Sequence, residues 1–524
     1  MKTLLAVVLL TAASAGDVPD PDAAISIGDR RELLVDDFLV EKISGEARLQ
    51  LHPPVPREIV FKTDAPWEGN ACGYPSVFQD GQLYRMYYHT GHYRHGGKPA
   101  EAGPVHPWFL CYAESDDGIH WRRPEQGLFE FEGSKKNNII LTPDCVASIK
   151  GDPAHTSVFK DANPACPEDA RYKCIMVGKP HGLYVLESAD GIRFRVAGGK
   201  PVITDGAFDS QNLAFWDPVR NEYRAYWRIF TAGVADGTAW KPEGFRAIRT
   251  ATSKDGRTWG GQADLQYVDS PAEHLYVNQI LPYYRAPHIF MGFPMRYTDR
   301  GWSDSMMALP GLEERLARSK ASPRYGTAIT DGLFMTSRDG VLFRRWNEAF
   351  LRPGPLRQGS WVYGDNMVFW GMVETASTLG DAPHDLSIYA SEHYWQATAV
   401  HVRRLTVRID GFVSLRASAR GGEMVTKPLV FDGGNLTLNM STSGAGGIQV
   451  EIQDAAGQPI PGYALADCPE VFGDELARVV RWRNGGDVRP LSGKPVRLRF
   501  VMKDADLYAF QFVSHQPDPV RPKP

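Results

Sequence analysis

The sequence lacks the features that mark zinc proteins and nucleic-acid-binding proteins. Only six cysteines occur in 524 residues, and none of them forms a Cys-x-x-Cys pair, so we expect no zinc site. The formal net charge is −4, and no basic run interrupts the chain. This weakly acidic balance argues against nucleic acid or an anionic membrane as a partner.

Long hydrophobic runs are also missing, because no segment reaches the roughly 20 apolar residues that a membrane helix needs. The chain begins MKTLLAVVLLTAASAG, in which a lysine, a short apolar run and small residues precede Gly16. This layout is typical of a secretory signal peptide. We therefore predict a signal peptide over residues 1–15 and a secreted or periplasmic protein. Export permits disulfides, and Cys166 and Cys174, which flank the turn-rich segment PEDAR, are the pair that we favour.

One pattern is abundant, since Ser-x-Asp-Gly-x-x-Trp/Phe occurs four times. The copies are ESDDGIHW (114–121), ESADGIRF (187–194), TSKDGRTW (252–259) and TSRDGVLF (336–343). An Asp-Gly pair between β-rich flanks indicates a tight hairpin turn, because glycine accepts a positive φ. We predict that the repeat is structural and takes no part in chemistry.

A second hairpin precedes each copy, so each unit holds four strands. Such units, roughly 65–85 residues long, are typical of β-propeller blades. A fifth unit is visible at residues 361–375 and 385–395. We predict an all-β chain with a five-bladed β-propeller over residues 16–404, closed into a ring by a strand from RELLVDDFLVE (31–41).

The remaining segments have different sequence patterns. Residues 405–518 alternate apolar and polar side chains between regularly spaced turns, which predicts a β-sandwich. The proline-rich end, 519–524, is expected to be disordered. The segment MALPGLEERLARSKASPRYG (307–326), inserted in the fourth unit, has leucines near helical spacing and predicts a short surface helix that can overhang one mouth of the propeller.

The first strand of each blade lines the central channel, so residues just before these strands converge on one pocket. Acids precede three of the strands, namely Glu68, Asp152 and Asp209. Glycosidic bond cleavage requires one protonated and one ionised carboxyl group, and mutual repulsion and burial separate their pKa values. We therefore predict these three acids as catalytic, with Glu392 of the fifth blade as a fourth candidate.

Aromatic and neutral polar residues near the same strands suit a sugar pocket, and arginines could meet a uronate or sulfate. The substrate-binding candidates are Trp67, Tyr74, His155, Gln211, Asn278, Arg228, Arg296 and His393. Each also has a structural reading as a packed, water-bonded or salt-bridged side chain. We expect no organic cofactor; calcium at a propeller axis is compatible with the sequence, but no ligand loop indicates it.

The arrangement resembles the five-bladed propeller glycosidases of glycoside hydrolase families 32 and 43, with a C-terminal β-sandwich as in family 32. The segments VDDFLV, WEG, FDSQNLAFWDP, YVNQILPY to FPMRY, DGFVSL and KDADLYAFQF are similar to secreted bacterial proteins described as family-32-like. In these families three inner-strand acids act as nucleophile or base, transition-state stabiliser and general acid. The resemblance assigns these roles to Glu68, Asp152 and Asp209, in that order.

This chain departs from family 32 in three respects, the first being that the family's Trp-Met-Asn-Asp-Pro-Asn opening is absent. Gly151 replaces the arginine before the stabilising aspartate, and the third acid is aspartate rather than glutamate, so we do not expect invertase-type activity. The repeated turn resembles the Asp box of sialidases but is one residue shorter, and the sequence shows no convincing arginine triad.

These observations predict a glycoside hydrolase that acts on a plant or algal polysaccharide or oligosaccharide in the axial pocket. A lectin-like propeller that binds carbohydrate without catalysis is the alternative, because it would keep the aromatic and polar residues without needing convergent acids. A scaffold propeller with a protein partner is a third reading. Fold alone does not decide among them.

Overall fold

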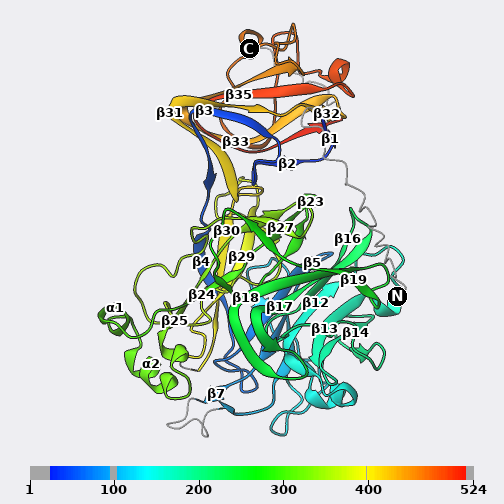
Figure 1. Cartoon of the computed structure of the whole chain (residues 1–524), viewed down its shortest axis with the longest axis vertical. Coiled ribbons are helices and arrows are strands. Elements are labelled where there is room, and N and C mark those ends of the chain that lie inside the picture. The colour runs from blue at the N-terminus through cyan, green and yellow to red at the C-terminus, as the bar shows by residue number, and fades with distance from the viewer. Residues whose placement is uncertain (1–23, 95–102, 397, 515–524) are drawn as a thin grey trace, which may run out of the picture. The chain divides into compact units, whose positions relative to one another are not determined.

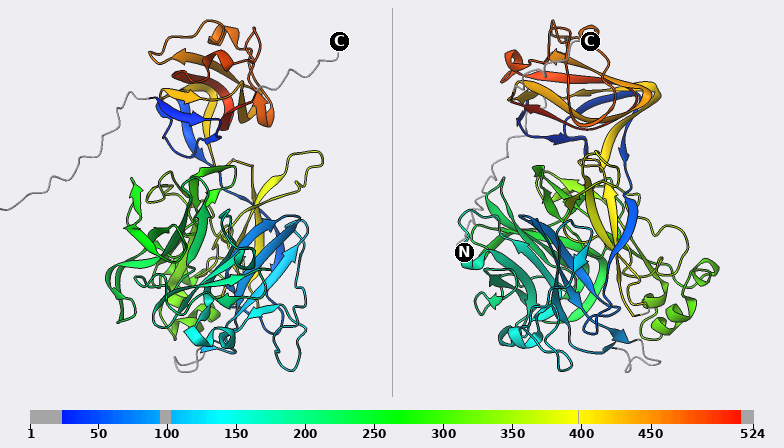
Figure 2. Two further views of the ribbon diagram at one scale, coloured as in Figure 1. Left: turned by 90° about the vertical axis from the view of Figure 1, so that its right-hand side faces the viewer. Right: turned by 180° about the vertical axis from the view of Figure 1, so that it is seen from behind.

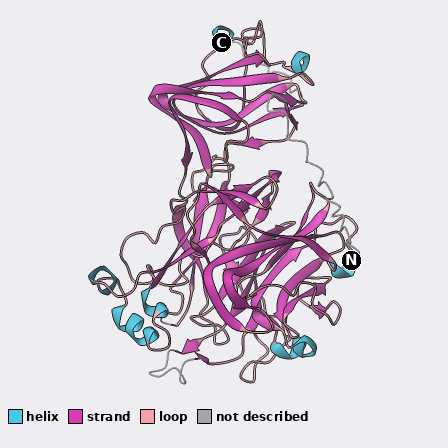
Figure 3. Cartoon of the chain, in the orientation of Figure 1, coloured by secondary structure: helices cyan, strands magenta, loops and turns pink. Residues whose placement is uncertain are grey.

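A computed structural model of the chain describes residues 24–94, 103–396 and 398–514, and its regular structure is mostly β-strand (Figure 3). The all-β prediction is therefore confirmed. The predicted signal peptide and the C-terminal tail lie outside the described residues. No helix in the described ranges is long and apolar enough to cross a membrane. The helices and 3-10 turns are η2 (Pro143–Ile149), η3 (Glu168–Ala170), α1 (Asp304–Met307), α2 (Leu312–Ser319), α3 (Arg324–Thr327), η4 (Leu465–Asp467) and η5 (Arg489–Leu491).

The chain divides into two compact units, and the division differs from the predicted one. Residues 33–36 and 49–414 form the larger unit, whereas residues 24–32, 37–48 and those from 415 onward form the smaller one. The predicted boundary at 405 falls inside β30 (His401–Val407), which pairs with β29 (Asp385–Glu392) in the larger unit. Non-local pairing explains the difference at the N-terminus, because β1 (Ile25–Gly28) pairs with β32 (Leu429–Phe431).

The smaller unit is built on one eight-stranded sheet. Its longest ladder pairs β33 (Asn435–Asp454) with β35 (Val496–Val513). The first six residues of β33, from Asn435 to Met440, are all buried, so both faces of the strand are covered there. The other strands of this sheet are β2 (Glu32–Leu33), β3 (Val40–Leu51), β31 (Val413–Thr426) and β34 (Asp474–Val479).

The larger unit contains five sheets of four or five strands that follow one another along the chain. The first three consist of β5 (Gly73–Asp80), β6 (Leu83–Thr90), β9 (Phe109–Ser115), β10 (Trp121–Arg122) and β11 (Ile139–Leu141); of β12 (Asp152–Lys160), β13 (Tyr172–Gly178), β14 (Gly182–Ser188) and β15 (Arg195–Val196); and of β16 (Leu213–Asp217), β17 (Glu222–Ala235), β18 (Trp240–Ser253) and β19 (Trp259–Asp264).

The last two of these sheets, and two smaller ones, complete the unit. The fourth consists of β20 (Gln266–Val268), β22 (Leu281–Tyr283), β23 (Ala286–Gly292), β26 (Met335–Ser337) and β27 (Leu342–Arg345); the fifth of β28 (Val373–Thr375), β29, β30 and β4 (Val55–Lys62); and the small sheets of β21 (His274–Leu275), β24 (Met295–Asp299) and β25 (Ala328–Gly332), and of β7 (Tyr93–Arg94) and β8 (Gly103–Pro104).

The first and last parts of the larger unit meet in the fifth sheet. Strand β4 pairs antiparallel with β30, and the blue and yellow strands lie side by side in Figure 2. The prediction that residues 31–41 supply this strand is wrong, because the described chain there holds only β2 and the start of β3. Residues of the quoted segment VDDFLV form bends and turns instead.

All four Ser-x-Asp-Gly repeats form the predicted turn, with one hydrogen-bond pattern. In the third copy, Asp255 accepts from the backbone N–H groups of Arg257 (2.8 Å) and Thr258 (2.7 Å), and Ser253 Oγ accepts from Gly256 N (2.9 Å). The four glycines have φ between +71° and +81°, a region that other residues rarely adopt. The structural role of the repeat is confirmed.

The turns also join neighbouring sheets. Tyr389 of the fifth sheet donates to the carbonyl of Gly118 in the first, Arg85 of the first donates to the carbonyl of Asp190 in the second (2.9 Å), and Tyr226 of the third donates to that of Gly340 in the fourth (2.9 Å). Three of the four repeats thus place a carbonyl oxygen where the preceding sheet binds it.

A closed circuit of hydrogen bonds links five inner segments, which we define as β5, β12 and residues 211–217, 278–283 and 366–370; residues 211–217 comprise β16 and the two residues before it. Its links are Val158 N to Ser76 Oγ (3.1 Å), Ser157 Oγ to Asn212 O (2.6 Å), Gln279 Nε2 to Gln211 Oε1 (2.9 Å), Gln279 Nε2 to Val368 O (2.9 Å) and Trp370 N to Pro75 O (3.0 Å). The last link returns to the first segment, so the five segments surround a common axis.

Candidate functional site

A residue with positive φ stands at or just before the start of every inner segment. These residues are Tyr74 (+48°), Lys150 (+44°), Phe208 (+57°), Gln279 (+49°) and Asn366 (+62°). Non-glycine residues in this region are strained, and such strain concentrates at functional sites. The left-handed turns bring Tyr74, Asp152 and Asp209 to the same end of the circuit, and we refer to their surroundings as the candidate site.

Asp152 lies in the candidate site beside a histidine. Its Oδ2 is 2.7 Å from Nδ1 of His155, and its Oδ1 accepts from the backbone N–H of Ala154 at 2.8 Å. Burial raises the pKa of Asp152, but the hydrogen bond from His155 and its charge lower it more, so the pKa lies below its ordinary value. The side chain remains 38% exposed, so this carboxylate is both ionised and accessible.

Asp209 is held by a buried arginine. Its Oδ1 lies 2.9 Å from Nη1 of Arg228, whose side chain is only 2% exposed, whereas that of Asp209 is 33% exposed. Arg228 also donates to the carbonyl of Tyr276 and stacks on its ring, with the guanidinium carbon 4.1 Å from the ring centroid. Asp209 is thus fixed in position by a group that cannot move into solvent.

Tyr74 joins the two carboxylates. Its ring lies 5.7 Å from that of His155 and 5.3 Å from that of His89, and Asp209 and Arg228 both act electrostatically on its hydroxyl. Burial raises the pKa of Tyr74 well above its ordinary value, so the phenol stays neutral. The carbonyl of His155 in turn accepts from Asn212, three residues after Asp209, at 3.2 Å.

Further tyrosines extend the candidate site. The ring of Tyr363 lies 5.6 Å from Tyr276, 6.0 Å from Tyr394 and 5.9 Å from Tyr325. Tyr74, Tyr276, Tyr325 and Tyr394 are each partly exposed. Aromatic faces of this kind can stack on the C–H faces of a sugar, while their hydroxyls offer hydrogen bonds.

Tyr276 and Arg324 lie in the candidate site but were not predicted from the sequence. For Tyr276, an alignment of the inner strands could have indicated its place. When QNLAF (211–215) is aligned with NQILP (278–282), Tyr276 takes the position of Asp209, but the search considered only acids there. Arg324 lies at the start of α3, in the inserted segment 307–326. The predicted helix in that segment is present as α2, but its buried side chains are Arg315 and Arg318, while Leu316 is 41% exposed.

Glu68 is not part of the candidate site, which corrects the prediction. Its carboxylate is fully buried and accepts two hydrogen bonds from Arg123, at 2.9 and 2.8 Å, and one from Tyr88, at 2.5 Å. A backbone N–H, that of Ala65, donates to the same carboxylate at 3.0 Å. Glu68 therefore has a structural role, and the sequence could not indicate it because Arg123 is distant along the chain.

Glu392 is likewise held in a structural ion cluster. Arg357 and Arg403 each lie 2.5 Å from its Oε1, and the side chain is 9% exposed. The neighbouring His393 is partly exposed, and its ring lies 4.3 Å from that of His401. In the described structure, neither residue forms a hydrogen bond or ion pair with Asp152 or Asp209, and two guanidinium groups leave the carboxylate of Glu392 little capacity for catalysis.

The other predicted binding residues are divided between the candidate site and structural positions. His155, Arg228 and Tyr74 line the candidate site, whereas Gln211 and Asn278 are buried on the axis. Trp67 donates to Asn138 at 2.7 Å, a contact between a turn and the residue before β11. Arg296 binds Asp331 (2.7 Å) and Glu273 (3.2 Å) and lines a separate cavity of about 780 Å³.

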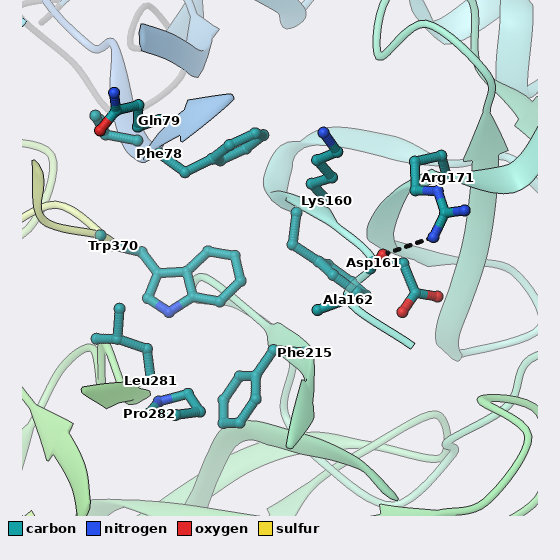
Figure 4. A pocket seen from close by; sticks show the side chains of 13 residues that line it. Phe78, Gln79, Lys160, Asp161, Ala162, Arg171, Phe215, Leu281, Pro282 and Trp370 are labelled. Atoms are coloured by element: carbon teal, nitrogen blue, oxygen red, sulfur yellow. Dashed lines mark hydrogen bonds between the residues drawn. The ribbon is translucent and has the colours of Figure 1, made fainter. Parts of the chain in front are cut away.

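Another cavity, of about 650 Å³, lies at the opposite ends of the inner segments (Figure 4). Phe78, Phe159, Phe215 and Trp370 make most of its wall apolar. Its one carboxylate, that of Asp161, is fully buried and bound to Lys173 at 3.0 Å. Because no second carboxylate lines this cavity, we do not place acid–base chemistry there.

Two expectations concern cysteines and metals. The described structure contains all six cysteines as free thiols, so the predicted Cys166–Cys174 disulfide is wrong; Cys174 is buried in a core, and Cys166 lies 3.3 Å from the Lys173 ammonium. In the part of the chain that the structure covers, no group of three or more His, Cys, Asp or Glu side chains is arranged to hold a metal ion.

Comparison with known proteins gives structural but no sequence matches. No family model and no curated protein matches the sequence. Among solved structures, an N-acetylgalactosamine deacetylase from F. plautii in complex with blood group B trisaccharide is 12% identical and has a TM-score of 0.40, over 68% of this chain and 95% of that chain. The RS223 β-xylosidase is 11% identical with a TM-score of 0.39, over 68% and 97%. A glycosyl hydrolase from Bacteroides ovatus is 14% identical with a TM-score of 0.35, over 72% and 93%.

Proposed function

We propose that this protein is an exported glycoside hydrolase that cleaves a plant or algal polysaccharide or oligosaccharide, with Asp152 and Asp209 as its catalytic carboxylates. The observation that carries the proposal is their placement. Both lie at the start of neighbouring inner segments, both are about one-third exposed, and Tyr74 stands between them. No other pair of predicted acids shares these properties.

The surroundings of the two carboxylates favour different roles. His155 and the Ala154 N–H favour the ionised form of Asp152, as a base or nucleophile requires. We assign the role of proton donor to Asp209. Because Arg228 pairs with Asp209 in the free protein, a substrate must weaken this ion pair before Asp209 can carry a proton. The assignment uses no organic cofactor.

We further propose that the larger unit is a five-bladed β-propeller and the smaller unit a β-sandwich. The hydrogen-bonded circuit of five inner segments and the pairing of β4 with β30 support the propeller. In such a ring, the candidate site would occupy one mouth of the axis, where residues from every blade converge. The eight-stranded sheet supports the sandwich.

A carbohydrate-binding propeller without catalysis is the second candidate, and one observation favours it. Glu68, Glu392 and Asp209 all form ion pairs with arginines, so each of these carboxylates already has a fixed partner within the protein. Such a protein would keep the tyrosines of the candidate site for stacking. It would release no sugar from any glycan that it binds.

Sugar release from a panel of plant, algal and host glycans tests the two candidates. The wild-type protein is compared with Asp152→Asn, Asp209→Asn and, as a matched control, Asp144→Asn at an exposed position. We expect the wild type and the control to release sugar. We expect the Asp152→Asn and Asp209→Asn variants to release none, while they still bind the glycan. Binding without release by any form would overturn the hydrolase and leave the binding protein.

A further inference from the structure

Three arginines gather around the ring of Tyr276. The guanidinium carbons of Arg228 and Arg246 lie 4.1 and 5.6 Å from its centroid, and that of Arg324 lies 5.6 Å from the ring of Tyr363, whose hydroxyl is bonded to Tyr276. They come from β17, β18 and the start of α3. Among the residues that the structure describes, only one carboxylate, that of Asp209, pairs with any of them, so the cluster carries excess positive charge.

The sheet explains why two of these arginines meet. Phe230 of β17 is the register partner of Arg246 of β18, and residues 228 and 230 lie on the same face of a strand because side chains alternate. Arg228 and Arg246 are therefore diagonal neighbours on one face, a spacing that long side chains can bridge. Like charges so placed repel, and burial together with Arg228 and Arg324 lowers the pKa of Arg246.

Arg246 and Arg324 lack anionic partners. Within residues 24–94, 103–396 and 398–514, neither guanidinium forms an ion pair with a carboxylate, and Arg246 Nε and Arg324 Nη1 are buried without a hydrogen-bond partner. Arg296, on nearby β24, shows the contrast, since it binds two carboxylates. An unpaired buried charge is costly, so this arrangement is stable only if it is offset by another interaction.

Stacking on tyrosines offsets part of that cost and leaves donors free. Arg246 lies 4.7 Å from the ring of Tyr297, and Arg324 lies 4.6 Å from that of Tyr325. These contacts use the flat face of the guanidinium, whereas its N–H groups point along the edge. Both residues are partly exposed, so an anion from solution can approach their guanidinium groups.

We infer that Arg246 and Arg324 form a subsite for the anionic group of a sugar, either a carboxylate or a sulfate ester. This inference rests on the proposed function, because the subsite adjoins Asp209 through Arg228 and Tyr276. It narrows the substrate class to acidic glycans. It also assigns a role to the inserted segment 307–326, because that segment contains Arg324 and places it at the candidate site.

Calorimetric titration with two matched pairs of sugars tests the subsite. The carboxylate pair is glucuronate and glucose; the sulfate pair is N-acetylglucosamine 6-sulfate and N-acetylglucosamine. The proteins are the wild type, Arg246→Gln/Arg324→Gln and, as a control, Arg300→Gln, whose side chain is exposed. We expect one anionic sugar to bind about tenfold or more tightly than its neutral partner, and the double variant alone to lose this preference. The preferred pair identifies the anion.

Folding of each variant is checked by circular dichroism. If the glutamine double variant does not fold, Arg246→Lys/Arg324→Lys, which keeps the charge but not the planar fork, should show a smaller loss, and added salt should weaken anionic but not neutral binding. Equal binding of anionic and neutral sugars by the wild type would overturn the subsite, as would an anion preference that survives in the double variant. Binding of neither sugar series would overturn it too.

These outcomes are separable from those that test hydrolysis. An anion preference that depends on the two arginines, in a protein that releases no sugar, would sustain the subsite and end the hydrolase proposal. If the protein releases sugar, Asp209→Asn abolishes that release and anionic sugars bind no more tightly than neutral ones, the hydrolase proposal would stand and the subsite would be overturned.

Discussion

The hydroxyl of Tyr363 donates a 2.6 Å hydrogen bond to the hydroxyl oxygen of Tyr276. Burial raises the pKa of Tyr276, but Arg228 and the bond from Tyr363 lower it more, and the net pKa lies below its ordinary value. Burial and the adjacent Tyr276 raise the pKa of Tyr363 well above its ordinary value. The pair therefore contains one phenol with a lowered pKa, Tyr276, and one with a raised pKa, Tyr363, which donates a hydrogen bond to it.

Tyr276 should form a phenolate at a lower pH than any ordinary tyrosine, whose pKa is about 10. Ultraviolet titration of tyrosinate absorbance should show an early step in the wild type that Tyr276→Phe removes. Tyr363→Phe should move this step to higher pH, because it deletes the donated hydrogen bond. An early step that persists in Tyr276→Phe would assign it to another residue.

The bond between His155 and Asp152 should set the acidic limit of activity. If Asp152 works in its ionised form, turnover falls as pH drops through its lowered pKa. His155→Gln removes the group that lowers this pKa most, so the fall should begin at higher pH. The pH–rate profile of sugar release measures the shift, and the exposed His120→Gln should leave it unchanged. A variant with lower turnover but an unmoved profile would show that His155 acts only in packing.

The features that were predictable from the sequence are local ones. The four Ser-x-Asp-Gly turns close their hydrogen bonds within six residues, so the motif contains all that determines them. The grouping of Asp152 and Asp209 was predictable because Asp152 begins an inner strand and Asp209 lies shortly before one. Sequence position predicts a contact correctly wherever the interacting residues are close together along the chain.

The failures involve contacts between distant segments. Glu68 resembles the other acids in position, but Arg123, which follows β10 and is 55 residues away along the chain, binds it. Strand β4 rather than residues 31–41 completes the fifth sheet, although both have strand-like sequences. Arg324 reaches Tyr363 only because the inserted segment folds back onto the candidate site. No pattern in the sequence encodes these partners.

Replacing Glu68 should affect stability rather than chemistry. Glu68→Gln leaves Arg123 without its buried counter-charge, which typically costs about 3–5 kcal/mol; the partial exposure of Arg123, at 26%, favours the lower figure. Urea unfolding measures the loss, and Glu130→Gln, at an exposed position, should change stability by less than about 0.5 kcal/mol. A stable, folded Glu68→Gln protein without turnover would return Glu68 to the catalytic set.

The repeated turns should confer stability that depends on pH. Backbone N–H groups of Thr258 and Arg257 lower the pKa of Asp255 to about 2, whereas an unfolded aspartate has a pKa of about 3.9. A lowered folded-state pKa means that the stabilisation is complete above the unfolded value and disappears as pH falls through the folded one. Asp255→Asn should therefore cost about 1 kcal/mol near neutral pH and almost nothing below about pH 2.

Urea unfolding of the wild type and Asp255→Asn across this pH range measures the difference, with the exposed Glu243→Gln as the control. Because Asp255 is itself exposed, solvent screens its charge, and the expected cost comes from its hydrogen bonds rather than from the full pKa shift. A cost that stays constant with pH would show that geometry alone, and not the ionised carboxylate, stabilises the turn. Since all four turns share these bonds, the same dependence should appear in Asp190→Asn, whose pKa is also lowered to about 2.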